Sequence, residues 1–194
     1  SEMCIRDRDT VILPGTMLQG KTKVGKNCIL GPDTQLTDVI CGDGNHLNRV
    51  YAHSCELGDN NEIGPFVHLR PETCLHNDIK IGNFVEVKNS DVDDGTKLPH
   101  LIYCGDSDLG KNVNFGCGTV TVNFDGKNKH RCTIDEHAFI GCNTNLVAPV
   151  HVGARAFTAA GSTITKDVPA KALAVGRAKQ VNIENWVKED TYKD

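Results

Sequence analysis

An aliphatic residue returns every six positions along most of this chain, and a small or β-branched residue stands two positions before many of these. A period of six fits neither an α-helix nor a plain strand. It fits short strands joined by tight turns, three of which make one coil of a triangular prism whose stacked coils share an apolar column. A β-sandwich with chance spacing is the alternative, and three in-phase runs argue against it. The runs are Ile12, Leu18, Val24, Leu30 and Leu36; Leu57, Ile63, Leu69, Leu75, Ile81 and Val87; and Ile140, Leu146, Val152, Thr158 and Ile164.

Composition narrows the class of protein further. The 194 residues are enough for one domain, and the net charge of −4 argues against a partner such as nucleic acid or a membrane surface. The cysteine count is nine, an odd number, with no CxxC pair, which favours a reducing cytoplasmic setting over a disulfide framework. We find no apolar run long enough to span a membrane and no signal peptide.

The repeat also predicts the domain organisation. Residues 1–8 match nothing downstream, so we expect them to be foreign to the domain. Residues 9–168 are predicted to form the prism, and the polar segment 122–133 should loop out of it. Residues 169–194 are expected to form a C-terminal arm, in which 182–189 has the composition of a short helix.

Two cations are spaced to meet on one edge of the prism. Arg70 and Lys88 are 18 residues apart, which is one coil, and such a pair can hold a phosphate. A solvated charged edge is an equally weighted alternative. His100 stands where the six-residue phase is disturbed, and its imidazole could accept a proton from an attacking amine, although a single histidine is more often structural.

Two other patterns imitate known sites but lack an essential part. The stretch Gly105 to Lys111 imitates a phosphate-binding P-loop, but Asn112 replaces the required Ser or Thr and no strand-to-helix context exists. A three-histidine zinc site of the β-helical carbonic anhydrase kind needs two histidines five residues apart, and no pair has that spacing. We therefore expect no metal at the reaction site.

Five sequence blocks resemble a known family over residues 9–186. They are IGPFVHLRPETCL, IGNFVEVKNS, KLPHLIYCGDSDLGKNVNFGCGTVTVNFDGKNKH, IGCNTNLVAPVHVG and TAAGSTITKDVP. They look like the C-terminal acetyltransferase domain of the bifunctional N-acetylglucosamine-1-phosphate uridyltransferase/glucosamine-1-phosphate acetyltransferase family, within the hexapeptide-repeat acyltransferases. The resemblance implies an all-β fold, a left-handed parallel β-helix.

The resemblance also implies residue roles. His100 would be the catalytic base, and Glu86 would help to orient or polarise it. The sugar phosphate would be held by Arg70, Lys88, Tyr103, Asn114 and Lys129. Acetyl-CoA, the co-substrate, would contact Cys117, Asn123, Phe124, Cys142, Ala160 and Arg177. The family forms homotrimers with shared active sites, towards which the Lys129 loop and the Arg177 tail would reach.

Three positions depart from the family pattern. Cys117 stands where Ala is familiar, Phe124 where Tyr is familiar, and Cys142 where Ser is familiar. A role of Cys117 through its backbone N–H would survive the change, and Phe124 keeps a face for stacking. A nucleophilic role for the Cys117 thiol is a minor alternative. The changes bear on contacts with coenzyme A more than on the reaction.

The function implied by the resemblance is acetyl transfer from acetyl-CoA to the 2-amino group of glucosamine-1-phosphate. The product would serve bacterial UDP-N-acetylglucosamine, peptidoglycan and lipopolysaccharide synthesis in the cytoplasm. Nothing in the chain resembles the uridyltransferase domain, so uridyl transfer is not expected. Alternatives are another hexapeptide acyltransferase, acting on serine, a nucleotide sugar or an antibiotic, and a non-catalytic β-helix that serves trimerisation or regulation.

Overall fold

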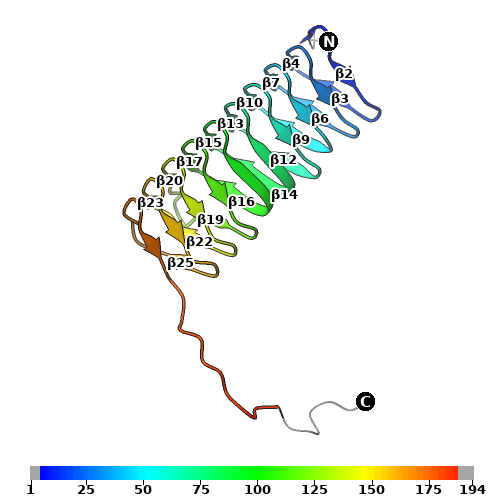
Figure 1. Cartoon of the computed structure of the whole chain (residues 1–194). Helices are drawn as coiled ribbons and strands as arrows, with labels where there is room; N and C mark the ends of the chain where they lie inside the picture. The colour runs from blue at the N-terminus through cyan, green and yellow to red at the C-terminus, as the bar shows by residue number, and fades with distance from the viewer. Residues whose placement is uncertain (1–4, 188–194) are drawn as a thin grey trace.

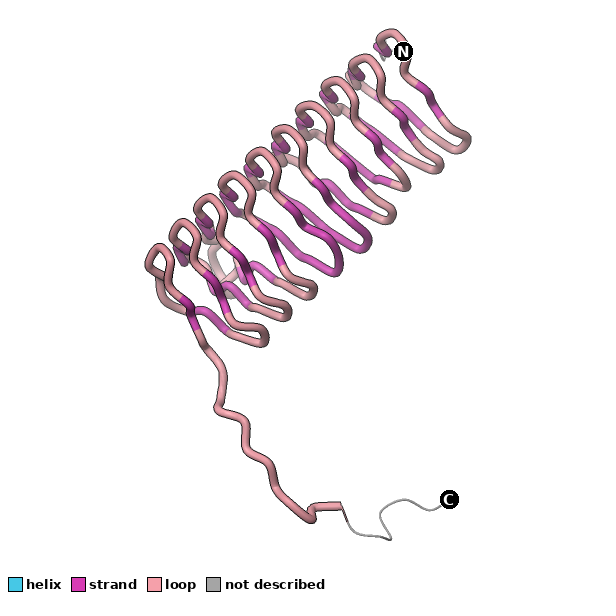
Figure 2. Tube along the Cα trace, in the orientation of Figure 1, coloured by secondary structure: helices cyan, strands magenta, loops and turns pink. Residues whose placement is uncertain are grey.

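The chain winds into a left-handed parallel β-helix of about ten coils, as the repeat and the family resemblance predict (Figure 1). The computed structural model describes residues 5–187, and no helix occurs among them. All strand pairs in the ladders are parallel, and successive strands on each face come from successive coils. Figure 2 shows the short strands joined by turns at the corners of the coils.

The prism has three faces, and each is a ladder of strands from successive coils. The first face contains β1 (Ile5–Arg6), β4 (Lys23–Val24), β7 (Ile40–Cys41), β10 (Glu56–Leu57), β13 (Cys74–Leu75), β15 (Asp91–Val92), β17 (Ser107–Leu109), β20 (Cys132–Ile134) and β23 (Val150–Val152). The second contains β2 (Val11–Ile12), β5 (Ile29–Leu30), β8 (His46–Leu47), β11 (Glu62–Ile63), the starts of β14 (Lys80–Lys88) and β16 (Lys97–Gly105), β18 (Asn114–Phe115), β21 (Phe139–Ile140), β24 (Phe157–Thr158) and β26 (Leu173–Ala174). The third contains β3 (Met17–Gln19), β6 (Gln35–Thr37), β9 (Val50–His53), β12 (Val67–Leu69), the ends of β14 and β16, β19 (Val120–Val122), β22 (Asn145–Val147) and β25 (Thr163–Ile164).

The aliphatic residues of the repeat form the core. Leu30, Leu36, Leu69, Val87 and Leu146 are fully buried, because strand alternation turns them inward while their neighbours face solvent. The first two members of the pattern are exceptions. Ile12 is 38% exposed and Leu18 is only partly buried, since their coil has one stacked neighbour instead of two among the described residues.

Buried threonines and asparagines bind the coils to one another. The Thr96 hydroxyl donates to the Gly110 carbonyl at 2.8 Å and accepts from the Val113 N–H at 3.1 Å. The Asn61 side chain donates to the His76 carbonyl at 2.9 Å and accepts from the Ile79 N–H at 2.8 Å. No buried side-chain polar atom of the described residues lacks a partner, which is why polar residues are tolerated at inward positions.

The prism extends beyond its predicted limits of residues 9 and 168. Ile5 and Arg6 pair with Lys23 and Val24 in register, so two residues of the segment 1–8 complete a coil. At the other end, β26 pairs with β24, and the Thr163 N–H donates to the Gly176 carbonyl at 2.9 Å. Whether the segment 1–8 is foreign to the domain stays a prediction.

The C-terminal arm (residues 177–187) leaves the prism as an extended chain (Figure 1). The helix predicted for 182–189 is absent over 182–187, which holds only a turn, and residues 188 and 189 lie outside the described part. Val181, Ile183 and Trp186 are more than two-thirds exposed. An isolated helix this short is not stable without a surface to pack on, and the arm packs on none of the described residues. No described helix has the length and apolarity needed to cross a bilayer.

Candidate active site

The two cations predicted to stack do lie level with one another on the third face. Strand β12 pairs with β14 from Val67 with Val85 to Leu69 with Val87. The Arg70 N–H then donates to the Val87 carbonyl at 2.8 Å, which aligns Arg70 with Lys88. Both side chains therefore project from the same end of this face, where the chain turns towards the first face.

A third cation reaches this edge from the extruded loop. The side chain of Lys129 contacts that of Lys88, and this contact and the charge of Lys88 lower the pKa of Lys129. The charge of Arg70 acts in the same direction. We call Arg70, Lys88 and Lys129 the cationic cluster. Three neighbouring cations repel one another, and binding of a doubly charged phosphate would relieve this repulsion.

Two carboxylates offset part of this charge. Glu86 Oε1 lies 2.9 Å from Arg70 Nη1, and Asp106 Oδ1 lies 3.6 Å from Lys88 Nζ. Glu86 is thus engaged by Arg70. The contact expected between Glu86 and His100 is not made within one chain, because His100 lies level with Asn83 at the opposite end of the face.

Asp106 is the buried centre of the cluster and was not predicted from sequence. Its residue is 3% exposed. The Asn89 side chain donates to Oδ1 at 2.6 Å, and the Asn123 side chain donates to Oδ2. Burial alone would raise the pKa of Asp106, but these hydrogen bonds and the charges of Lys88 and Lys129 outweigh it, and the pKa is lowered. Asp106 therefore remains a carboxylate that orients Lys88 and Asn123.

Tyr103 is positioned by the absence of a neighbouring side chain. The Asn123 amide donates to the Tyr103 hydroxyl at 3.3 Å. A Cβ placed on Gly105 would lie 2.5 Å from that hydroxyl oxygen and 2.8 Å from the Asn123 nitrogen. Glycine at 105 is thus required for the phenol to reach the amide. The sequence analysis considered Gly105 only as part of the rejected P-loop pattern and did not predict this contact with Tyr103.

The extruded loop is an ordered hairpin. Phe124 and Lys129 form an antiparallel bridge, and the His130 N–H donates to the Asn123 carbonyl at 2.8 Å. Asp125 Oδ1 accepts the N–H groups of Lys127 and Asn128 at 2.7 and 2.6 Å. Asp125 Oδ2 lies 2.7 Å from His130 Nε2. The hydrogen bond from the Asn128 N–H, followed by His130, lowers the pKa of Asp125 to about 2.

A second group of predicted residues lies along the corner between the second and third faces, one residue on each successive coil. The Gly118 N–H donates to the Leu101 carbonyl at 3.0 Å, the Asn143 N–H to Cys117 at 2.7 Å, and the Gly161 N–H to Cys142 at 2.8 Å. These bonds place the four members level with one another. We call them the corner ladder: His100, Cys117, Cys142 and Ala160.

The corner ladder offers unpaired backbone donors. The N–H groups of Cys117, Cys142 and Ala160 have no acceptor among the described residues. The coils approach closely here: a Cβ on Gly116 would lie 2.5 Å from the Cys142 nitrogen. A row of free N–H groups on a rigid corner can bind carbonyl or amide oxygens of an extended ligand, as the predicted coenzyme A contacts require.

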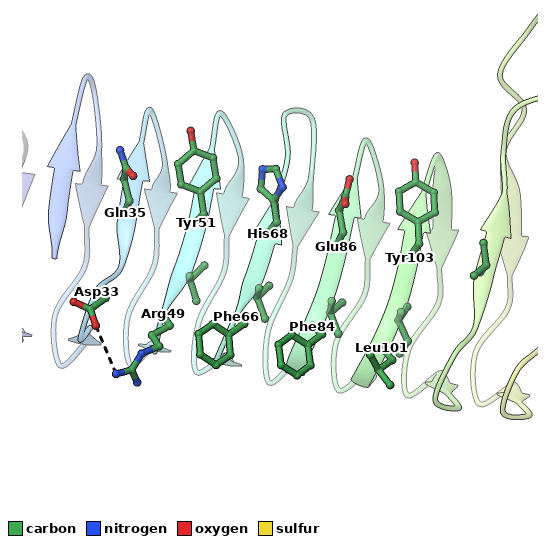
Figure 3. A pocket seen from close by; sticks show the side chains of 15 residues that line it. Asp33, Gln35, Arg49, Tyr51, Phe66, His68, Phe84, Glu86, Leu101 and Tyr103 are labelled. Atoms are coloured by element: carbon green, nitrogen blue, oxygen red, sulfur yellow. Dashed lines mark ion pairs between the residues drawn. The ribbon is translucent and has the colours of Figure 1, made fainter. Parts of the chain in front are cut away.

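His100 itself is exposed, and its imidazole has no hydrogen-bond partner among the described residues. The groove that separates it from the cationic cluster covers the third face and has a volume of about 850 Å³. Figure 3 shows two rows of side chains along this groove: Gln35, Tyr51, His68, Glu86 and Tyr103 lie above Asp33, Arg49, Phe66, Phe84 and Leu101. A single chain therefore holds His100 and the cationic cluster on opposite sides of the groove.

Asn114 and Arg177 are not brought to either group, whereas Phe124 meets the cationic cluster only through its backbone bridge to Lys129. Asn114 lies on the second face, paired with Lys97 and Phe139. Arg177 begins the exposed arm, and the Phe124 side chain in the loop is 55% exposed. Within one chain, the predicted site residues thus fall into the cationic cluster, the corner ladder and single residues that lie apart from both.

Together, the six-residue repeat and the three-faced prism define a hexapeptide-repeat protein of the parallel β-helix class. Among curated proteins, the chain is 53% identical over 180 residues to the bifunctional protein GlmU of Geobacillus sp. (strain WCH70), covering 93% of this chain and 39% of the relative. It is 56% identical over 182 residues to GlmU of Caldanaerobacter subterraneus subsp. tengcongensis, covering 94% and 40%. The chain is homologous to the C-terminal half of the bifunctional GlmU proteins, and it spans about two-fifths of their length.

No protein-family model matches the chain. Among solved structures, the polySia specific acetyltransferase NeuO aligns with a TM-score of 0.41 and 17% identity, covering 100% of this chain and 92% of that one. AntD, an N-acyltransferase from Bacillus cereus, aligns with a TM-score of 0.43 and 16% identity, covering 80% and 79%.

Proposed function

We propose that this chain transfers the acetyl group of acetyl-CoA to the 2-amino group of glucosamine-1-phosphate. The observation that carries the proposal is the cationic cluster of Arg70, Lys88 and Lys129, assembled beside Tyr103 and Asn123 in a homologue of the GlmU proteins. A sugar phosphate is a dianion with hydroxyl groups, and this edge offers cations together with neutral hydrogen-bonding groups.

In the proposed reaction the amine nitrogen attacks the thioester carbonyl carbon. A C–N bond forms, the C–S bond breaks, and the amine proton passes to His100 and then to the departing thiolate. His100 suits this task because its imidazole is exposed and unpaired among the described residues. A free N–H of the corner ladder, at Cys117, Cys142 or Ala160, would stabilise the developing oxyanion. No proposed step requires a metal.

The site requires more than one copy of the chain. His100 and the cationic cluster lie on opposite sides of the third face, and Asn114 and Arg177 are on neither side. The lower row of the groove contains Phe66, Phe84 and Leu101, each more than half exposed (Figure 3). We propose a homotrimer that covers this apolar row and brings the corner ladder, the second face and the arm of neighbouring copies to the cationic cluster.

We place the protein in the bacterial cytoplasm, where acetyl-CoA is made and where its product would supply UDP-N-acetylglucosamine for cell-wall synthesis. The eight cysteines of the described part are all free thiols, which fits a reducing compartment. Neither a nucleic acid nor a membrane is proposed as a partner.

The first test is release of coenzyme A thiol with glucosamine-1-phosphate as acceptor. His100→Ala should lower kcat by about 10²- to 10⁴-fold, the usual contribution of a general base. The matched control is His151→Ala, because His151 lies on the first face, where Asp135 holds it at 2.8 Å. A rate for His100→Ala within a few-fold of the parent would contradict the assigned base.

The second test addresses the acceptor. Arg70→Met and Lys88→Met should chiefly raise the KM for glucosamine-1-phosphate, because they act through its phosphate. Glucosamine without the phosphate should react far more slowly with the parent protein. Equal rates for both acceptors, or faster transfer to serine, a nucleotide sugar or an aminoglycoside, would exclude the proposed substrate. An absence of acetyl-CoA binding by calorimetry would instead favour a non-catalytic β-helix.

A further inference from the structure

The first face carries a thiol and an imidazole side by side on one strand. In β13 and the residue after it, Leu75 is 1% exposed and points into the core. Alternation along an extended chain therefore turns Cys74 and His76 outward together. Both are partly exposed, so they remain accessible from solvent.

The next coil adds a carboxylate at the same level. Strand β13 pairs with β15 so that Cys74 lies opposite Asp91. Asp91 Oδ1 is 2.9 Å from His76 Nε2. One ligand atom from each of Cys74, His76 and Asp91 lies within 4.8 Å of the other two. The ladder hydrogen bonds of the prism fix this register, so the three donors converge without any rearrangement of the backbone.

The donor set is one that zinc prefers. A thiolate, an imidazole and a carboxylate bind Zn²⁺ with metal–ligand distances of about 2.0–2.3 Å, so that donors on one ion lie about 3–4 Å apart. A set spread over no more than 4.8 Å needs only side-chain rotations to close on an ion. Three protein ligands leave the fourth tetrahedral position for water.

The surroundings favour a cation at this place. The ligand atoms of Asp93 and Asp94 also lie within 4.8 Å of a His76 ring nitrogen, so a carboxylate is available to orient the imidazole. Glu56 lies opposite Cys74 on the preceding coil. Lys111 is held by Asp94 at 3.2 Å, and no ion pair of a lysine or arginine with Asp91, Asp93 or Glu56 occurs among the described residues.

We propose that Cys74, His76 and Asp91 form a binding site for a divalent transition-metal ion of the zinc type, with Asp93 or Asp94 orienting His76. The ion would replace the proton of the Cys74 thiol and would join two neighbouring coils across the first face. This site lies on a different face from the proposed acetyl-transfer groove and takes no part in that reaction. The metal-site proposal does not depend on the proposed function, and the proposed function does not depend on the metal site.

The test is a Co²⁺ titration of the full chain after treatment with a chelator. One equivalent of Co²⁺ should produce the visible absorption of tetrahedral cobalt together with a thiolate-to-cobalt charge-transfer band, and Zn²⁺ should displace it. Cys74→Ser should abolish the charge-transfer band, and His76→Gln should weaken Co²⁺ binding at least about tenfold. Acetyl transfer by Cys74→Ser should equal that of the parent.

Two control variants keep the assignment specific. His151→Gln removes a histidine that is paired with Asp135 on the same face but has no cysteine beside it, and Cys142→Ser removes an exposed thiol of the corner ladder. Both should keep the full cobalt spectrum. A parent protein without a charge-transfer band, or a band that survives in Cys74→Ser, would overturn the proposal. Equal weakening by His151→Gln would do the same, since binding would then be unspecific.

Discussion

At the scale of single residues, Gly105 illustrates how the proposed sugar-phosphate site depends on a missing side chain. Gly105→Ala would place a methyl group 2.5 Å from the Tyr103 hydroxyl oxygen, so the phenol must turn away from Asn123. Overpacking of this kind costs about 1–3 kcal/mol. We expect the KM for glucosamine-1-phosphate to rise about tenfold, measured by thiol release.

The control for this prediction is Gly126→Ala in the extruded loop. Gly126 has a positive φ of 96°, and a Cβ there would meet nothing within 4 Å. It should strain the loop without touching Tyr103. An unchanged KM for Gly105→Ala would show that the position of the phenol is unimportant for the acceptor.

The cationic cluster shows what sequence reasoning reaches at this scale. Arg70 and Lys88 could be aligned from their spacing alone, because one coil separates them. Asp106 was not predicted, because side chains were aligned only at a spacing of 18 residues. Asn89, Asp106 and Asn123 recur at intervals of 17 residues, and that column of polar residues was the available signal. The contact of Gly105 with Tyr103 depends on side-chain rotamers, which spacing does not specify.

At the scale of elements, the extruded loop is held by one carboxylate. Asp125→Ala removes the acceptor of two backbone N–H groups and of His130, and so loosens the hairpin that carries Lys129. We expect the KM for glucosamine-1-phosphate to rise several-fold, while the unfolding midpoint of the prism stays the same because the loop lies outside its core. Asp125→Asn keeps the acceptor for the backbone and should retain most of the affinity.

The same carboxylate determines how the loop responds to acid. Its pKa is lowered from 3.8 to about 2 in the folded chain. The stabilisation of the loop by the Asp125 carboxylate is therefore complete at pH values above the ordinary pKa of an aspartate. It is lost only as the pH falls through about 2. At a pH of about 4, the backbone amides of Lys127 and Asn128 should exchange slowly in the parent protein and faster in Asp125→Ala. Equal exchange rates in the two proteins would contradict the role of the Asp125 side chain.

The strands were predictable because the aliphatic spacing of six encodes them directly, and the loop was predictable because it breaks that spacing. The lengths of the coils were not. Val24 pairs with Cys41 and Cys41 with Leu57, which are steps of 17 and 16 residues instead of 18. These differences in coil length occur in the corner turns, so the residues that face inward on successive coils remain aligned. The helix predicted for the arm failed because composition was used where no partner surface exists among the described residues.

At the scale of the whole molecule, the apolar row of the third face predicts that a charged substitution in this row would dissociate the proposed trimer. Phe66 and Phe84 stack with their ring centroids 5.5 Å apart, and Phe84 is 55% exposed. Phe84→Glu should convert the proposed trimer to monomers and abolish acetyl transfer, because a buried carboxylate without a partner is costly. Light scattering gives the mass, and far-ultraviolet circular dichroism reports the fold.

Ile40→Glu is the matched control, since Ile40 is 51% exposed on the first face. It should remain trimeric and active. Shared sites can be tested further by mixing Lys88→Met with Arg177→Ala in the unfolded state and refolding them together. At glucosamine-1-phosphate concentrations near the KM of the parent, the mixed oligomers should be more active than either variant alone. A monomeric parent with full activity would contradict the trimer and the shared site together.

The corner ladder has a consequence for how such a chain can change over time. Each coil contributes one rung to the corner and pairs only with the coils above and below it. Duplication or loss of an entire lap would keep every surviving rung aligned, whereas a change by part of a lap would rotate all later rungs onto another face. The length of this corner can therefore change only by whole coils.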